Sequence, residues 1–356
     1  MQLSSLWRGN RPIKSRINCL LDSSFKYSGP RCEYPLSFRL QWPVKTLAMS
    51  AAPSPLTAPK PPIIDDKSPH CIPFILRQLS RHRSLPTNAS KPFFIGLNGV
   101  QGAGKTTLVS ALATTLRKKE GLETLVCSID DLYLKHEDQV ALAREHRDNP
   151  LVQHRGEPGT HDMALARELF SALREGRETR VPEYDKSVFN GQGDRVPSFQ
   201  WKTVNGADQP KIQVIIFEGW CVGFRALSAG EVEEKQKRPS TTLHRHRLED
   251  LLFVNGRLRE YEVVNGVLDA FIHIDAEEMG YVYAWRQEQE AALRREKGVG
   301  MSVEEVERFV DGYYPAYELF TDKLRQGLFK GREDGKGRQL RLIVGRDRRV
   351  KEVIEI

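Results

Sequence analysis

The feature that most constrains this chain is a glycine-rich stretch that lies between an apolar run and a helical pattern. It matches the phosphate-binding pattern G-x-x-x-x-G-K-[ST] with residues Gly99, Val100, Gln101, Gly102, Ala103, Gly104, Lys105 and Thr106. The apolar run at 93–97 precedes it, and a helix-like stretch at 108–116 follows it. Because a phosphate loop needs a strand before it and a helix after it, the context predicts an α/β fold with a nucleotide site.

The chemistry of this loop predicts its ligand. Glycines at Gly99, Gly102 and Gly104 permit positive φ and close backbone approach, so successive N–H groups up to Thr107 can hold the oxygens of a polyphosphate. The positive end of the following helix adds to this attraction. Lys105 is expected to reach the β and γ phosphates, and the Thr106 hydroxyl to coordinate Mg²⁺. The predicted ligand is therefore a nucleoside triphosphate, taken to be ATP, with Mg²⁺.

Four further apolar runs, at 123–129, 212–217, 268–274 and 339–344, are separated by helical patterns. Such alternation predicts a three-layer α/β/α fold of the P-loop NTPase type, with a mostly parallel five-stranded sheet. A short helix is expected at Cys71–Leu79. Two stretches break the alternation, 182–208 with its Gly, Pro and Asp and 229–250 with its many charges, and both are predicted to be surface insertions.

The positive charge of the chain is concentrated near its start. The formal net charge is +7, and residues 1–48 hold eight Lys and Arg against only Asp22 and Glu33. The rest is therefore close to neutral, which argues against nucleic acid as a partner. A Pro- and Ala-rich linker follows at 50–62. We predict a leader and linker without packed structure over 1–62, and one P-loop domain over 63–356.

The leader has two interpretations. It is Arg- and Ser-rich and poor in acids, as mitochondrial transit peptides are, but prolines interrupt any amphipathic helix and Met49 offers a second start. No stretch reaches 18 consecutive apolar residues, so no membrane span is expected. The five cysteines are scattered, and Cys127 and Cys221 are expected to be small buried hydrophobes. A reduced, cytoplasmic location is predicted, with a mitochondrial one as the alternative.

Carboxylates follow two of the predicted strands. The second strand ends in Ser-Ile-Asp-Asp-Leu-Tyr, which places Asp130 and Asp131 at the carboxyl edge of the sheet, where open α/β folds bind ligands. Asp130 is predicted to accept the proton of an attacking hydroxyl and to lie near the metal, with Asp131 as the second candidate. Alternatively the pair caps the next helix. The third strand ends in Glu218, which is expected to hold Mg²⁺ directly or through water.

Two loops concentrate polar side chains and are candidates for binding the acceptor. Residues 155–162 contain Arg155 and His161, and residues 181–187 contain Tyr184 and Lys186. Each loop alone is equally well explained as a surface turn, and each gains weight only beside the phosphate loop.

A helix that begins near residue 283 and runs to Gly298-Val299-Gly300 is predicted to be a lid. Arg286 is our candidate to close over the transferred phosphoryl group, because an arginine there neutralises charge and excludes water. Arg294 and Arg295 are the alternatives, or the solvated face of the same helix.

A set of short motifs resembles a known family. In chain order they are G-x-x-G-x-G-K-[ST]-T, S-I-D-D-x-Y-L, H-x-D-Q, N-P-L, R-G-x-P-G-T-H-D, P-x-Y-D-K-S, F-E-G-W, W-R-x-x-Q-E and Y-Y-P-A-Y-E. They are similar to those of the D-glycerate 3-kinases of plants and fungi, within the wider group of uridine kinase, phosphoribulokinase and pantothenate kinase. The resemblance implies phosphoryl transfer from ATP to D-glycerate, with Lys105 at the phosphates and Asp130 as the base. Asp131 and Tyr133 of the same S-I-D-D motif are expected to line the acceptor site.

The residues themselves leave the acceptor open. A short acid needs cations, which Arg155 and Lys186 supply, whereas a nucleoside or pantothenate-like alcohol needs an aromatic wall, which Tyr184 and Trp201 supply. A nucleotide-dependent switch is the rival from another class, but the N-K-x-D guanine reader of GTPases is absent from the sequence. The expected partner is a small molecule, and the expected state is a monomer or weak homodimer.

Overall fold

A computed structural model describes residues 65–298 and 300–356. The predicted leader and linker, the alternative start at Met49 and the cysteines Cys19 and Cys32 lie outside the described residues. Within the described part, no helix has the length and the apolar character that a membrane crossing requires.

All five predicted strands form one sheet. They are β1 (Phe93–Gly99), β2 (Thr124–Ser128), β7 (Val214–Gly219), β8 (Ala270–Ala276) and β9 (Gln339–Val344), and they lie in the order β9-β8-β1-β7-β2. Each pair of neighbours is parallel, so all five carboxyl ends lie at one edge. The central strands are buried on both faces, as parallel strands in such folds are. The prediction of a mostly parallel sheet is confirmed.

The predicted number of five strands is wrong by one. A sixth strand, β10 (Val350–Glu355), pairs antiparallel with β9 at the edge of the sheet. Its residues are mostly exposed and include Lys351, Glu352 and Glu355. An edge strand of this kind lacks the apolar run by which the buried strands were recognised, and its charges protect the edge from further pairing.

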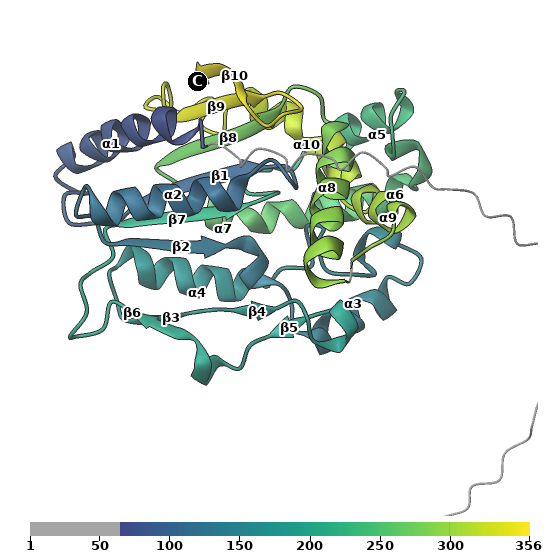
Figure 1. Cartoon of the computed structure of the whole chain (residues 1–356), viewed down its shortest axis with the longest axis horizontal. Helices are drawn as coiled ribbons and strands as arrows, with labels where there is room; N and C mark the ends of the chain where they lie inside the picture. The colour runs from purple at the N-terminus through teal and green to yellow at the C-terminus, as the bar shows by residue number, and fades with distance from the viewer. Residues whose placement is uncertain (1–64, 299) are drawn as a thin grey trace, which may run out of the picture. The chain divides into compact units, whose positions relative to one another are not determined.

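Helices cover both faces of the sheet, so the predicted three-layer order is confirmed (Figure 1). Neighbouring residues of a strand point to opposite faces. The ring of Phe93 contacts His82 of α1 (Ser68–Ser84), whereas the ring of Phe94 contacts Phe170 of α4 (Met163–Arg174). Helix α1 contains the predicted Cys71–Leu79 and packs beside α2 (Lys105–Lys118).

Helix α7 (Glu262–Asn265) lies beside α4, and the remaining helices gather near the carboxyl edge of the sheet (Figure 1). They are α3 (His136–Glu145), α5 (Ala229–Lys237), α6 (Leu248–Arg257), α8 (Tyr281–Lys297), α9 (Val303–Asp311) and α10 (Tyr314–Arg325). Helix α8 ends at Gly298, whose φ of 71° closes the helix in the left-handed conformation that favours glycine. Helices α8 and α9 pack together and form the predicted helical lid region.

The two predicted insertions contain regular structure of their own. Residues 182–208 form a small hairpin of β4 (Tyr184–Asp185) and β5 (Asp194–Arg195), and contribute β6 (Lys202–Val204), which pairs with β3 (Thr179–Val181). The charged stretch 229–250 contains α5 and the start of α6. Of these segments, the β4–β5 hairpin reaches the carboxyl edge of the sheet, because Lys186, which follows β4, contacts Asp130.

Candidate active site

The phosphate loop connects β1 to α2 at the centre of the carboxyl edge. Gly102 and Gly104 adopt φ of 78° and 94°, values that L side chains rarely take, so the expected positive φ is present at these two positions. Gly104 is also the N-cap of α2, and the free amides of the first helical turn follow it at Lys105, Thr106 and Thr107. Thr106 and Thr107 are exposed at this turn. The loop therefore has the backbone of an anion site.

The reason that we gave for Gly99 is wrong. Its φ is not among the positive values, and it forms the last residue of β1. A side chain there would instead meet Ile274 Cβ at 3.1 Å and Lys105 Cγ at 3.3 Å. The glycine is needed because the strand of β8 and the lysine stem pack close against it.

Lys105 is held over the mouth of the loop. Its Nζ donates to the carbonyl oxygens of Gly99 (2.7 Å) and Val100 (3.2 Å). Burial lowers the pKa of Lys105, and the negative charges of Glu218 and Asp130 act in the opposite direction. The lysine, both carboxylates and the second cation Lys186 thus act on one another electrostatically at a single place.

Strand register brings the predicted carboxylates to the phosphate loop. Glu218 of β7 lies opposite Leu97 of β1 on one side and Ser128 of β2 on the other. Asp130 and Asp131 follow Ser128 in a short turn of 3₁₀ helix at 129–132, whose first amide is capped by the Ser128 hydroxyl. The two aspartates lie inside this capped turn. They do not cap the next helix, α3, whose N-cap is Lys135, so that alternative is wrong.

Asp130 forms an ion pair with Lys186 from the 182–208 insertion. The Lys186 Nζ lies 2.5 Å from Asp130 Oδ2, while the other oxygen, Oδ1, is buried and makes no hydrogen bond to any described residue. Burial raises the pKa of Asp130, but Lys186, His161 and the nearby Tyr133 hydroxyl together hold it below its usual value. Asp130 is thus ionised at neutral pH with one oxygen free to accept a hydrogen bond.

Asp131 has a different environment from Asp130. Burial, assisted by the charge of Asp130, raises the pKa of Asp131 to about 6, although backbone amides of Tyr184 and Ser128 oppose this shift. The carboxylate therefore ties the end of β2 to the hairpin that carries Lys186. We therefore assign Asp131 the role of positioning this hairpin beside Asp130.

His161 and Tyr133 form the floor beside Asp130. The two rings stack at 4.4 Å, and Tyr133 also lies edge-on to Tyr184 at 5.4 Å. The Tyr261 hydroxyl accepts from the Gly159 amide (3.1 Å), so its own proton is available to His161 Nδ1 at 2.6 Å. When the Tyr261 hydroxyl donates to Nδ1, the neutral ring carries its proton on Nε2, which is buried and has no hydrogen-bond partner among the described residues.

The charge state of His161 follows from its burial, which lowers its pKa to about 4, with Asp130 acting against the shift. The imidazole is therefore neutral at physiological pH and presents a buried Nε2–H donor near the Asp130 carboxylate. A free donor and a free acceptor at one place are the pairing that a polar small molecule requires.

The comparisons with known proteins agree with this geometry. Residues 94–225 match the model of the phosphoribulokinase/uridine kinase family. An uncharacterized kinase of Schizosaccharomyces pombe is 41% identical over 243 residues, which are 67% of this chain and 84% of that protein. The chain belongs to this family of P-loop kinases. It is a phosphotransferase with an alcohol group as acceptor and a nucleotide as co-substrate.

Two D-glycerate 3-kinases are also similar to this kinase. The chloroplastic enzyme of Arabidopsis thaliana is 38% identical over 238 residues, which are 65% of this chain and 48% of that protein. The solved structure of the enzyme from Cryptococcus neoformans superposes with a TM-score of 0.73 at 34% identity, and covers 82% of this chain and 99% of that one.

The other predicted cations of the kinase lie farther from Asp130. Arg155 donates to the carbonyl oxygens of Gly191 (2.7 Å) and Gln192, and its guanidinium lies 5.7 Å from the Tyr184 ring centre. Arg286 lies on α8 and pairs with Glu290 at 2.6 Å. Its guanidinium stacks over Phe309 at 4.6 Å. Its described contacts therefore place it between α8 and α9, and no contact with the phosphate loop is present among the described residues.

Trp201, proposed as part of an aromatic wall, is not brought to this site. Its indole N–H donates to the Val196 carbonyl at 2.7 Å, and its side chain lines a separate hollow beside α4, with Arg167 and Leu169. Tyr184 alone remains from that predicted wall.

Sequence reasoning missed the residues that support the phosphate loop from behind. Arg348, in the turn before β10, donates to the Gly102 carbonyl at 2.7 Å and pairs with Glu288 at 2.8 Å. Trp285 of α8 packs so closely on Gly102 that a side chain there would meet its Cβ at 2.5 Å. The Tyr317 hydroxyl lies 3.4 Å from the Gln101 amide. The W-R-x-x-Q-E motif, which contains Trp285, and the Y-Y-P-A-Y-E motif, which contains Tyr317, marked part of this set in advance, but not its contact with the loop.

The donor atoms at this edge suit Mg²⁺. No group of three or more His, Cys, Asp and Glu with metal-ligand spacing occurs in residues 65–298 and 300–356. Mg²⁺ takes hard oxygen ligands and keeps several waters, so it is bound by one or two protein oxygens together with phosphate oxygens. Thr106 and Glu218 offer hard oxygens next to the loop, with Asp130 close by.

Proposed function

We propose that this kinase transfers the γ-phosphoryl group of Mg-ATP to the 3-hydroxyl of D-glycerate and forms 3-phospho-D-glycerate. Two similar proteins carry the name D-glycerate 3-kinase, and one of them is matched over 99% of its structure. The proposed substrate is a small acid that carries hydroxyl groups, so its site must supply both a proton acceptor and groups that bind a carboxylate.

The observation that carries this proposal is the pair of unpartnered buried atoms beside the phosphate loop. Asp130 Oδ1 is a free acceptor, and His161 Nε2–H is a free donor. Lys186 adds a positive charge, and its side chain is half exposed, at 53%. A glycerate hydroxyl donating to Oδ1, with its carboxylate near Lys186 and Nε2, satisfies all three groups.

The residues divide the chemical work in the following way. The loop amides and Lys105 hold the β and γ phosphates, and Thr106 and Glu218 would hold Mg²⁺, which would supply positive charge against the phosphate oxygens. The acceptor oxygen forms a bond to the γ phosphorus while the bond from that phosphorus to the β–γ bridging oxygen breaks, which releases ADP. The hydroxyl proton passes to Asp130 Oδ1. Arg286 on the lid is the proposed cation for the developing charge.

A larger acceptor is less well supported. A nucleoside or a pantothenate-like alcohol needs an aromatic wall, and Trp201 lies elsewhere. A nucleotide-dependent switch needs no acceptor, yet a free donor and acceptor are both buried beside the loop. For partners we propose a small molecule, a monomeric or weakly dimeric state, and neither nucleic acid nor a membrane.

The test is an ADP-release assay on the purified full chain with Mg-ATP and single acceptors. The panel is D-glycerate, L-glycerate, uridine, pantothenate and ribulose 5-phosphate, with a control that lacks acceptor. We expect turnover with D-glycerate and at least about tenfold less with each other compound.

Two outcomes would contradict the proposal in different ways. Turnover with another alcohol in place of D-glycerate would replace the acceptor and keep the mechanism. ADP release that does not depend on any acceptor would favour the switch.

A further inference from the structure

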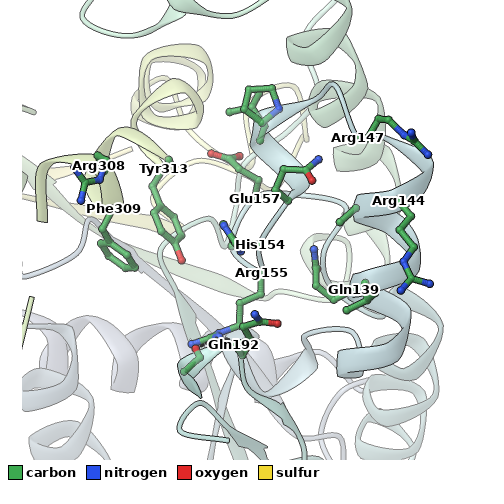
Figure 2. Close-up of a pocket in the computed structure, with 18 of the residues that line it drawn as sticks. Gln139, Arg144, Arg147, His154, Arg155, Glu157, Gln192, Arg308, Phe309 and Tyr313 are labelled. Atoms are coloured by element: carbon green, nitrogen blue, oxygen red, sulfur yellow. Dashed lines mark hydrogen bonds between the residues drawn. The ribbon is translucent and has the colours of Figure 1, made fainter. Parts of the chain in front are cut away.

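A second hollow is lined in part by Gly156 and Tyr313, which connect it with the floor of the acceptor site. It has a volume of about 690 Å³ and is lined by α3, the loop 150–157, residues 190–192 and the end of α9 (Figure 2). A volume of this size suits a small molecule. No residue of the phosphate loop lines it, nor do Asp130, Lys186 and Glu218. A ligand confined to this hollow would therefore not touch the groups of phosphoryl transfer.

Cations dominate the lining of this hollow. Figure 2 shows Arg144 from α3 and Arg147, which follows α3, on one side and Arg308 from α9 on the other, with His154 and Arg155 between them. Arg144, Arg147 and Arg308 are exposed, and within residues 65–298 and 300–356 they form no ion pair and no hydrogen bond. We call this hollow, with its four arginines and one histidine, the arginine pocket.

Unpaired arginines are not the rule in this part of the molecule. Arg245 pairs with Asp311 at 2.7 Å, and Arg247 pairs with Asp250 at 2.8 Å. Arg308 lies on the same helix as Asp311 and forms no ion pair among the described residues, although the charge of Glu304, one turn before it, acts on it. Like charges that converge on a hollow repel one another unless an anion joins them.

The single carboxyl group of the lining does not supply that anion. Glu157 is 2% exposed, and neither of its oxygens has a hydrogen-bond partner among the described residues. Burial raises the pKa of Glu157 well above its usual value, which favours the protonated, uncharged form of the group. A protonated carboxyl leaves the positive field intact, and its O–H can donate to an anionic oxygen.

We propose that the arginine pocket binds a small organic molecule with two or more negative charges, such as a phosphorylated or polycarboxylic acid. Arg144, Arg147 and Arg308 hold its charges, and the Glu157 hydroxyl donates to it. The site is distinct from the acceptor site and does not depend on D-glycerate being the acceptor. Arg155 and Gly156 belong to the same loop as His161, and Tyr313 lies next to Tyr133. A ligand bound in the arginine pocket would therefore act on the residues beside Asp130 through this loop and Tyr313.

Calorimetric titration of the full chain tests the proposal without any turnover. The protein is saturated with Mg-ADP and D-glycerate, and then titrated with 2-phosphoglycolate and, separately, with citrate. We expect at least one probe to bind with a measurable Kd that weakens as salt is raised.

Four variants locate the binding. Arg144→Gln with Arg147→Gln, and separately Arg308→Gln, should each weaken Kd at least about tenfold. Arg174→Gln, an exposed arginine on α4 outside the pocket, should leave Kd within about twofold. Lys186→Ala removes the cation of the acceptor site and should leave Kd unchanged. Thermal melting checks that each variant is folded, as expected for exposed side chains without described partners.

Three results would overturn the proposal. The first is that neither probe binds the wild-type chain. The second is that Lys186→Ala abolishes binding while the pocket variants do not, which would place the anion in the acceptor site. The third is that Arg174→Gln weakens binding as much as the pocket variants, which would show attraction by net charge alone. A failure of the D-glycerate assay would change none of these readings.

Discussion

The two halves of the candidate active site differ in how they are built. The nucleotide half consists of nine consecutive residues, 99–107, between one strand and one helix. The acceptor half joins four separate segments, with Asp130 from the end of β2, His161 from the loop before α4, Lys186 from the hairpin insertion and Tyr313 from the start of α10. The residues of the nucleotide half are positioned by the strand and helix on either side of the loop. Those of the acceptor half are positioned by contacts between distant segments.

Phosphate binding therefore depends on local backbone geometry, whereas acceptor binding depends on contacts between distant segments. The loop amides can bind phosphate in any protein that supplies the strand and the helix. The acceptor half depends on the 2.5 Å ion pair between Asp130 and Lys186 and on the ring stack of Tyr133 and His161. Changes in the nucleotide half should therefore remove activity, whereas changes in the acceptor half should divide between turnover and acceptor affinity.

The largest effect is expected for Lys105→Ala. Removal of the charge held over the loop takes away stabilisation of the transferred phosphoryl group, so kcat/KM should fall about 10³-fold, or ~4 kcal/mol. Steady-state kinetics with Mg-ATP measures this. Lys118→Ala, at the exposed end of the same helix, is the matched control. An activity of Lys105→Ala within threefold of wild type would contradict the assignment of Lys105 and the phosphate loop to the nucleotide half.

Asp130→Asn should lower kcat on the order of 100-fold while KM for ATP stays nearly constant, because the amide cannot accept the hydroxyl proton. Asp131→Asn is the comparison, since that carboxylate positions the hairpin and should cost less turnover. A larger loss for Asp131→Asn than for Asp130→Asn would reverse the two assigned roles.

Arg286→Ala tests whether the lid belongs to the nucleotide half. We expect kcat to fall about tenfold with little change in KM, as for a charge that acts in the transition state. Arg295→Ala, an exposed residue of the same helix, should retain wild-type kcat. A normal kcat in Arg286→Ala would leave this arginine with only its structural contacts to Glu290 and Phe309.

Glu157→Gln addresses the stability of the acceptor half. Burial raises the folded-state pKa of Glu157, so above about pH 4.5 the unfolded chain releases a proton that the folded chain retains. The wild-type free energy of unfolding therefore loses up to about 1.4 kcal/mol per pH unit from this group as pH rises. The Gln variant lacks this loss.

Urea unfolding of both chains at pH 5, 6, 7 and 8 measures this difference. The stability advantage of Glu157→Gln should grow with pH, and all other titrating groups cancel because both chains contain them. Parallel stability curves would mean that Glu157 is ionised in the folded protein, which would also remove the donor assigned to the arginine pocket.

Much of the nucleotide half could be predicted from local patterns. The five parallel strands were visible as buried apolar runs, and the loop and Asp130 as motifs at strand ends. The edge strand β10 was missed because it has charges in place of an apolar run. Arg348 was missed, and the contact of Trp285 with Gly102 was not predicted, because nothing near either residue in sequence indicates that it meets Gly102.

The sequence by itself determined the fold family, the phosphate loop and the choice of Asp130, because each depends on periodicity or on hydrogen bonds within a few consecutive residues. Tertiary structure alone decided which polar atoms remain without partners. Asp130 Oδ1, His161 Nε2 and the Glu157 carboxyl are buried without hydrogen-bond partners among the described residues. They are so because the segments that pack around them come from distant parts of the sequence and bring no donor or acceptor to these atoms. The physical reason is that hydrogen-bond satisfaction and burial are properties of the packed neighbourhood and are absent from any single segment.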